Sequence, residues 1–250
     1  MVERPAVLLV NHGSRQPFAA AFAEELSAAL RRDVPDRIVA VSYLELNRPS
    51  PAQALRRLAS EGTTEVQVVP LLFSAGYHYR IDISAAVDSA LTAQPEMRVR
   101  TAAPLLHDSD DALVTALDAR LDEAMEALPS GAPGTPDGLV LLAAGSSDAA
   151  ARTRVAELGH TWGLSHGLPA EVAFCDLRSD EARTAIALLQ ARGARQIACG
   201  ALFLAAGRLL AAGRRAALQA GATVVSGPLG MTPALTDLIR RRCSQPLPAG

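Results

Sequence analysis

Two imidazoles and one carboxylate stand at equal spacing in the first half of the chain. His12, Glu45 and His78 follow one another at intervals of 33 residues. Imidazole nitrogens and carboxylate oxygens bind divalent iron, cobalt or nickel, and the same groups accept protons near neutral pH. A single histidine in a loop is ordinarily structural or solvated. The hypothesis of a metal or proton-transfer site therefore depends on the fold bringing all three side chains together.

Short apolar runs that alternate with Ala-rich amphipathic stretches predict strands and helices of an α/β fold. The expected strands of the first half are Ala6–Val10, Ile38–Leu44, Glu65–Pro70 and Met97–Ala102. His12 follows the first of them, Glu45 ends the second, and His78 lies in the loop after the third. Because ligands of parallel sheets bind beyond the carboxyl ends of the strands, we expect the three side chains on one rim.

The order of elements restarts after a Pro- and Gly-rich segment at residues 129–138. LLVNHGSR (8–15) matches LLAAGSSD (141–148), VSYLEL (41–46) matches VAFCDL (172–177), and LLFSAGYH (71–78) matches LFLAAGRL (202–209). The offsets of 133, 131 and 131 residues indicate an internal duplication. We therefore predict two tandem α/β modules, residues 1–128 and 139–250, each a parallel sheet flanked by helices and joined by a linker at 129–138, with a cleft between them.

The second copy lacks both imidazoles. The positions equivalent to the candidate trio are Ala144, Asp176 and Leu209. A role in folding should persist in both copies, whereas a duplicated module needs only one active site, so the asymmetry favours a function in the first half. Divergence of two surface loops is the simpler alternative.

Composition excludes several classes of function. The formal charge of -2 does not suggest nucleic acid as a partner. All 24 basic residues are Arg, which excludes lysine Schiff-base chemistry. The three cysteines have no CxxC spacing, so neither a zinc site nor a disulfide framework is expected. The apolar run near the N-terminus is too short for a signal peptide or a membrane span, and we expect a cytoplasmic protein with no membrane partner.

Three motifs carry a resemblance to a known family. LLVNHGSRQPFA, YLELNRPS and PLLFSAGYHYRIDI resemble the sirohydrochlorin cobaltochelatases and ferrochelatases of the class II chelatase superfamily, in the long form with two fused halves. The resemblance implies a lyase that inserts Co²⁺ or Fe²⁺ into sirohydrochlorin for siroheme or cobalamin biosynthesis. It also implies that His12, Glu45 and His78 are the metal-binding and proton-handling residues. The metal is then a substrate, and no permanently bound cofactor is expected.

Sirohydrochlorin carries several carboxylates, which Arg side chains can bind through two parallel hydrogen bonds. Each Arg near the motifs could equally be a solvated surface residue. The macrocycle is expected in the cleft between the modules. The candidate substrate-binding residues are Ser14, Arg15, Arg48, Ser74, Tyr77, Arg80 and Arg208.

Other functions remain open at this point. Histidine phosphatases also carry His-Gly after a first strand, but they usually have Arg before the His, where this chain has Asn11. A serine hydrolase is disfavoured because no G-x-S-x-G elbow is present. A non-catalytic metal or tetrapyrrole carrier, or a chelatase for Ni²⁺ or another tetrapyrrole, would need the same residues. We expect a monomer, since a two-module chain can form the cleft by itself.

Overall fold

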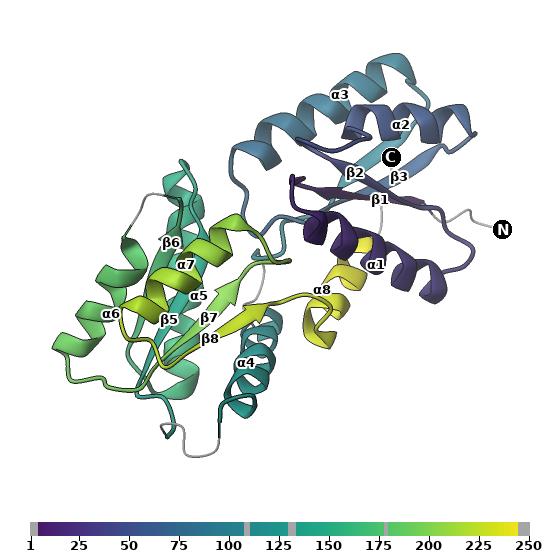
Figure 1. Ribbon diagram of the computed structural model, residues 1–250. Coiled ribbons are helices and arrows are strands. Elements are labelled where there is room, and N and C mark those ends of the chain that lie inside the picture. Colours follow the sequence, from purple (N-terminus) through teal and green to yellow (C-terminus); the bar gives the residue numbers. More distant parts are fainter. Residues whose placement is uncertain (1–4, 108–110, 130–133, 178–179, 245–250) are drawn as a thin grey trace. The chain divides into compact units, whose positions relative to one another are not determined.

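The computed structural model describes residues 5–107, 111–129, 134–177 and 180–244. Two compact units make up the chain (Figure 1). The first comprises Met1–His107 and Thr236–Gly250, and the second comprises Asp108–Leu235. Across the described ranges, none of the helices has the length and apolar character needed to span a membrane.

The first unit is built on a four-stranded parallel sheet in the order β2-β1-β3-β4. Leu9 of the central strand β1 lies opposite Val41 of β2 on one side and Val69 of β3 on the other. Every residue of β1 is buried, as expected for a strand covered on both faces. The strands are β1 Ala6–Asn11, β2 Val39–Tyr43, β3 Glu65–Pro70 and β4 Arg98–Thr101.

Helices cover both faces of this sheet because the chain moves outward from β1 in two directions. Right-handed crossovers then place α1 on one face and α2 and α3 on the other, as Figure 1 shows. Leu8 of β1, Leu55 of α2 and Val68 of β3 share one apolar core on the face of α2 and α3. The helices are α1 Pro17–Asp33, α2 Pro51–Ser60, the π-helix η1 His78–Ile83 and α3 Ser84–Ala93.

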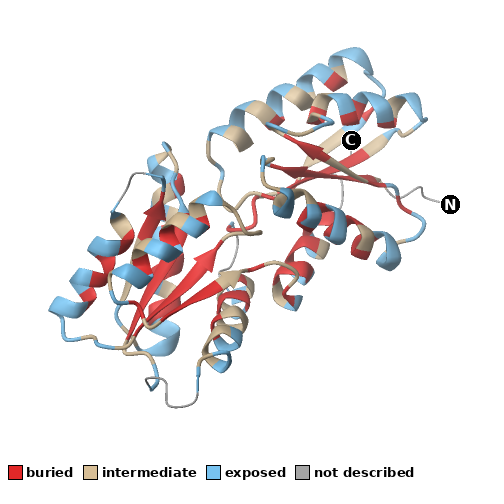
Figure 2. Ribbon diagram, viewed as in Figure 1, coloured by how far each residue is buried: buried red, intermediate tan, exposed pale blue. Residues whose placement is uncertain are grey.

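The second unit repeats this topology with the strand order β6-β5-β7-β8. Figure 2 shows its strands buried between helices whose outer faces are exposed. The strands are β5 Gly138–Ala144, β6 Ala170–Cys175, β7 Ile197–Leu202 and β8 Val224–Pro228, and the helices are α4 Asp111–Glu126, α5 Ala149–His166, α6 Glu181–Ala191, α7 Arg208–Gln219 and α8 Pro233–Cys243, which continues into the first unit. The two parallel sheets flanked by helices confirm the predicted fold class.

The units exchange their last helices. Helix α4, which precedes the Pro- and Gly-rich segment, contacts β7 and β8 of the second sheet, and its Arg120 Nε donates to the Leu229 carbonyl at 3.0 Å. Helix α8, at the end of the second repeat, belongs largely to the first unit. There Arg37 Nη1 donates to the Cys243 carbonyl at 3.0 Å, and Arg240 forms an ion pair with Asp33 at 2.7 Å. The compact units thus differ from the sequence repeats by one helix each.

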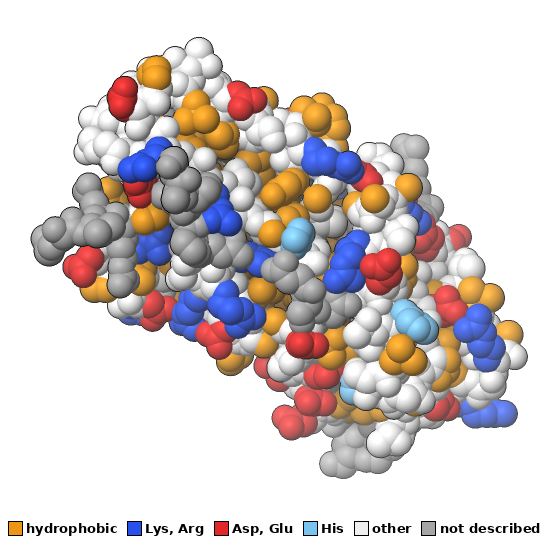
Figure 3. All heavy atoms as spheres, turned by 180° about the vertical axis from the view of Figure 1, so that it is seen from behind, with side chains coloured by type: hydrophobic (Ala, Val, Ile, Leu, Met, Phe, Trp, Pro, Cys, Tyr) orange, Lys and Arg blue, Asp and Glu red, His pale blue; other side chains and the backbone are white. Residues whose placement is uncertain are grey.

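Charged side chains of both signs are spread over the surface. Figure 3 shows basic side chains, all of them Arg, interspersed with acidic and apolar ones over the visible face. This mixture agrees with the formal net charge of -2.

Candidate functional site

The candidate residues lie where the strand order of the first sheet reverses. In the order β2-β1-β3-β4, the connections from β1 and β3 leave toward opposite faces, and such a switch point is where open parallel sheets bind ligands. His12 directly follows β1, and His78 opens the π-helix η1 after β3. Glu45 stands two residues beyond the end of β2. Single π-helical turns are rare and occur frequently at functional sites.

The two histidines face each other through the same ring nitrogen. His12 Nε2 and His78 Nε2 are 3.2 Å apart, and the rings meet edge to face with centroids 4.6 Å apart. Glu45 Oε1 lies 4.0 Å from His78 Nε2. The His78 side chain is 30% exposed and that of Glu45 is 52% exposed, so solvent reaches the group. Within the described ranges no three His, Cys, Asp or Glu side chains form a closed metal cluster, which leaves a histidine pair with a carboxylate beside it.

A second carboxylate, which the sequence interpretation missed, contacts His78. Asp82 Oδ2 lies 2.6 Å from His78 Nδ1, one helical turn further along η1. Residues four apart on a helix face each other, so the His-x-x-x-Asp spacing was the available signal. Of the two His78 nitrogens, Asp82 holds one and His12 the other.

Hydrogen bonds between the loops after β1 and β2 set the positions of His12 and Glu45. The backbone N–H of Glu45 donates to the His12 carbonyl at 3.0 Å, and that of Ser14 donates to Asn47 Oδ1 at 2.7 Å. Gly13 has φ +95°, and a Cβ there would collide with the Glu45 carbonyl oxygen. The sequence interpretation named His12 and Glu45 but not Asn47, whose amide joins the two loops.

The expected substrate-binding residues are distributed around this rim with one exception. Arg15 and Arg80 are exposed beside the two histidines, and Ser74 is half-buried. Tyr77 is 59% exposed, with its ring edge-to-face to His78 at 6.0 Å. Arg208 is exposed at the start of α7 in the second unit.

Two of the expected binding residues have local structural partners. The Ser14 hydroxyl accepts a hydrogen bond from the Gln16 N–H at 3.0 Å, which shapes the turn into α1. Arg48 Nη1 donates to Gln53 Oε1 at 3.2 Å, and Gln53 also forms the capping box of α2 with Ser50. A role in substrate binding at these two positions stays a prediction.

Large apolar side chains are exposed in the loops that carry the charged groups. Phe18 at the start of α1 is 56% exposed, Leu46 beside Glu45 is 58% exposed, and Ile81 between His78 and Asp82 is 50% exposed. Leu46 has φ +62°, an unusual conformation for a residue with a Cβ. Exposed apolar groups near polar ones are typical of sites that bind flat organic molecules.

The equivalent positions of the second unit have no such group. Ala144 is the last residue of β5, and Asp176 follows β6. Leu209 lies in α7 and packs against the apolar core of that unit. The histidine pair is thus a feature of the first unit, as the sequence comparison of the repeats predicted.

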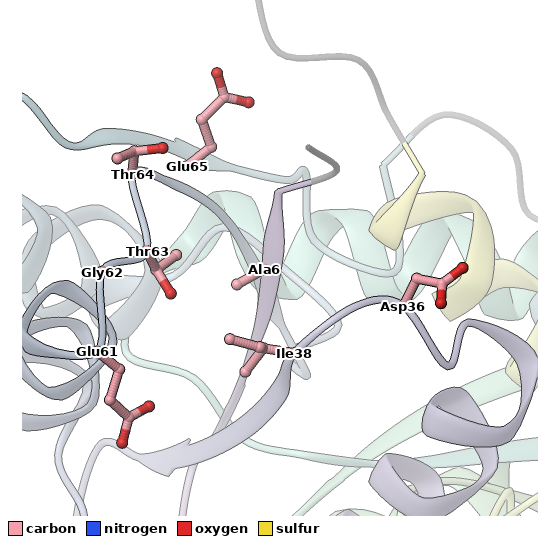
Figure 4. Close-up of a pocket in the computed structure, with 8 residues that line it drawn as sticks. All are labelled: Ala6, Asp36, Ile38, Glu61, Gly62, Thr63, Thr64 and Glu65. Carbon is pink, nitrogen blue, oxygen red and sulfur yellow. The ribbon is translucent and has the colours of Figure 1, made fainter. Parts of the chain in front are cut away.

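A shallow pocket of about 120 Å³ lies at the other edge of the first sheet (Figure 4). Its lining includes Ala6 at the start of β1 and Glu65 at the start of β3, so it opens at the amino ends of the strands. The histidine pair stands at the carboxyl ends. The lining residues are Ala6, Asp36, Ile38, Glu61, Gly62, Thr63, Thr64 and Glu65, with no imidazole or thiol among them.

Comparisons with known proteins agree with this geometry. The CbiX family model matches residues 6–124 and 138–246. The chain is 30% identical over 149 residues to the sirohydrochlorin ferrochelatase of Bacillus subtilis (58% of this chain, 52% of that protein). It is 40% identical over 77 residues to the sirohydrochlorin cobaltochelatase of Sulfurisphaera tokodaii (31% of this chain, 62% of that protein).

A solved structure shares the fold over nearly the whole length. The sirohydrochlorin chelatase SirB from Bacillus subtilis subspecies spizizenii, solved in complex with cobalt, superposes with a TM-score of 0.77 at 20% identity, covering 96% of this chain and 94% of that one. The alignments to the first curated relatives span 63%, 52% and 45% of their lengths. The family match, in contrast, extends through both repeats, and the chain therefore belongs to the CbiX family.

Proposed function

We propose that this protein inserts a divalent metal ion, Co²⁺ or Fe²⁺, into sirohydrochlorin, and that His12, Glu45 and His78 carry the reaction. The supporting observation is the pair of His Nε2 atoms 3.2 Å apart at the switch point of the first sheet. Membership of the CbiX family and relatives named as sirohydrochlorin chelatases support the same reaction.

The spacing of the two nitrogens suits a shared metal ion. Two nitrogens on one tetrahedral or octahedral ion, with bonds of about 2.0–2.1 Å, lie about 2.9–3.4 Å apart. The distance from His12 Nε2 to His78 Nε2 is 3.2 Å. Glu45 is half exposed, so its side chain is free to turn toward an ion held by the imidazoles. The three groups together match the preferences of late divalent transition metals.

Insertion replaces two protons of the macrocycle by one metal ion. Four metal–nitrogen bonds form, the bonds from the ion to water and to the protein break, and two pyrrole N–H protons leave. We assign delivery of the ion to His12 and His78 and proton acceptance and charge balance to Glu45. A carboxylate beside two neutral imidazoles offsets part of the charge of the incoming ion, and all three groups are able to accept protons.

The surroundings of the trio suit a flat, acidic ring. Exposed Leu46, Tyr77 and Ile81 offer apolar surface for the face of the macrocycle. Arg15 and Arg80 can bind its carboxylates through paired hydrogen bonds. The expected cleft between the modules, the monomeric state and the cytoplasmic location stay predictions.

The test is anaerobic absorbance spectroscopy of sirohydrochlorin mixed with Co²⁺ or Fe²⁺, compared with the rate without protein. Wild type should accelerate insertion, and His12→Ala and His78→Ala should each lose at least about 100-fold of that acceleration. His160→Ala, at an exposed position on α5, is the matched control and should retain the wild-type rate. Unfolding curves of all variants verify that the fold is intact.

Two outcomes would overturn the proposal. No acceleration by wild type, combined with tight binding of Co²⁺ or of the macrocycle, would indicate a carrier. Acceleration that survives in both site variants would place the chemistry elsewhere in the chain. Faster insertion of Ni²⁺ than of Co²⁺ and Fe²⁺ would change the proposed metal.

A further inference from the structure

We infer that Asp82 is a positioning residue that fixes His78 in the one tautomer able to bind a metal ion through Nε2. The inference rests on the proposed function, since it assigns a role in the delivery of that metal. The relationship behind it is the 2.6 Å contact between Asp82 Oδ2 and His78 Nδ1.

The chemistry of the two groups determines where the proton lies. An ionised carboxylate only accepts hydrogen bonds, so the proton in a bond between Asp82 and His78 is carried by Nδ1. The neutral imidazole then has its lone pair on Nε2. That nitrogen faces His12 Nε2 at 3.2 Å and lies 4.0 Å from Glu45 Oε1. The bond to Asp82 thus presents a metal-binding lone pair at the centre of the candidate site.

The turn that carries both residues is anchored to the body of the first unit. Ile83, next to Asp82, is buried with 1% exposure in the core shared with β1 and β3. Tyr79, next to His78, packs against the same core, and its hydroxyl donates to the Ala102 carbonyl at 3.3 Å. Because both neighbours are held, the carboxylate and the imidazole keep a fixed relation, and the ring is oriented before a metal arrives.

The second repeat has lost both members of the pair. With the offset of 131 residues, Leu209 occupies the position of His78, and Gly213 occupies that of Asp82. Gly213 faces the opposite requirement, since a Cβ there would collide with Cys175 Sγ. A carboxylate kept only to stabilise the helix would not depend on the histidine, so the joint loss favours a role for Asp82 through His78.

Carboxylates that hold a metal-binding histidine act through ligand orientation and basicity. Removing such a partner typically lowers metal affinity by about 10- to 100-fold. Asp82 does not need to touch the metal for this effect. Its own side chain is 37% exposed, so truncation should not disrupt the core.

The first measurement is long-range ¹H–¹⁵N NMR of the histidine rings in the metal-free protein. Wild type should show His78 protonated at Nδ1, and Asp82→Ala should show a mixture of both tautomers. Asp82→Asn can accept the same hydrogen bond through its amide oxygen and should keep most of the Nδ1–H form. Asp88→Ala, at an exposed position on α3, is the matched control and should match wild type.

The second measurement is the affinity for Co²⁺ alone, by calorimetry, without tetrapyrrole. Asp82→Ala should bind about 10- to 100-fold more weakly than wild type, and Asp82→Asn should lie between the two. An Nε2–H tautomer in wild type, or an unchanged tautomer and Co²⁺ affinity in Asp82→Ala, would overturn the inference. Since neither readout requires insertion, a protein that shows both effects but no chelatase activity would refute the proposed function and leave this role of Asp82 standing.

Discussion

Gly13 lies against the main chain of Glu45, so the loops after β1 and β2 meet at a point where no side chain fits. A Cβ on Gly13 would collide with the Glu45 carbonyl oxygen and approach Asn47 Oδ1 to 3.2 Å. The backbone of Gly13 also has φ +95°, which disfavours residues with a Cβ. His12 and Glu45 owe their proximity to this close approach.

Gly13→Ala should therefore destabilise the protein and displace His12 from Glu45. The expected cost is about 2–4 kcal/mol, the sum of a left-handed backbone strain of about 1–2 kcal/mol and of steric overlap. Chemical denaturation measures it. Gly62→Ala is the control, because Gly62 has φ +88° with open space around its Cβ position and should show the backbone strain alone. Equal losses in the two variants would contradict a steric contact between the loops.

Asn47 should matter for activity more than its half-exposed position suggests. Its Oδ1 accepts the Ser14 N–H at 2.7 Å and so joins the His12 loop to the Glu45 loop. Asn47→Ala should cost about 1 kcal/mol of stability and lower the rate of metal insertion, whereas Asn47→Asp keeps an acceptor oxygen and should restore most of the rate. Insertion rates of the two variants decide the matter, and equal rates would exclude this role.

Asp118 should be important for the stability of the second unit. Its Oδ1 accepts the indole N–H of the fully buried Trp162 at 2.7 Å and contacts His166 Nε2 at 2.8 Å, which links α4 to α5. Asp118→Ala leaves the indole N–H without this partner and should cost about 1–3 kcal/mol in thermal unfolding. Asp122→Ala, at an exposed position one turn further along α4, should change stability by less than about 0.5 kcal/mol.

The cysteines predict a loss of stability at alkaline pH. Burial raises the pKa of Cys199 to about 12 and that of Cys243 to about 12 from 9.0. Burial and the charges of Glu181 and Asp176 raise the pKa of Cys175 to about 11. A raised pKa in the folded state means that the unfolded thiols ionise first. Stability is therefore complete below pH 9 and falls as the pH rises toward 11–12.

Urea unfolding at pH 8 and pH 10 measures this effect. Each buried thiol should contribute a loss of about 1.4 kcal/mol over the first pH unit above its unfolded pKa. Cys199→Ala should show a correspondingly smaller difference between the two pH values than wild type, whatever its own stability. The same difference in both proteins would show that Cys199 is not responsible.

Local sequence patterns were sufficient for the strands and for the rim on which the trio lies. Apolar runs such as Ala6–Val10 could only be buried strands in a chain that alternates them with amphipathic helices, and the parallel sheet then placed His12 and His78 at one edge. The equal spacing of the trio reflects the length of one strand, helix and connection.

Tertiary relations were outside the reach of the same patterns. Nothing in the amphipathic pattern of α4 or α8 states which of two similar sheets each helix covers, because both sheets present apolar faces. The partner of His78 was visible only as a spacing on a helix that was not expected to begin at His78 itself. Asn47 was missed because its amide acts on the backbone of a loop 33 residues away.

The exchange of α4 and α8 has a consequence for the order in which the protein matures on the ribosome. Residues 5–107 emerge first, yet Arg37 and Asp33 of this part find their partners Cys243 and Arg240 only after more than a hundred further residues have been synthesised. Contacts so distant in the chain form late and slow folding. The second unit, whose helices and strands are contiguous from α4 onward, can therefore be completed while the first still waits for its closing helix, and the nascent chain acquires its candidate active site last.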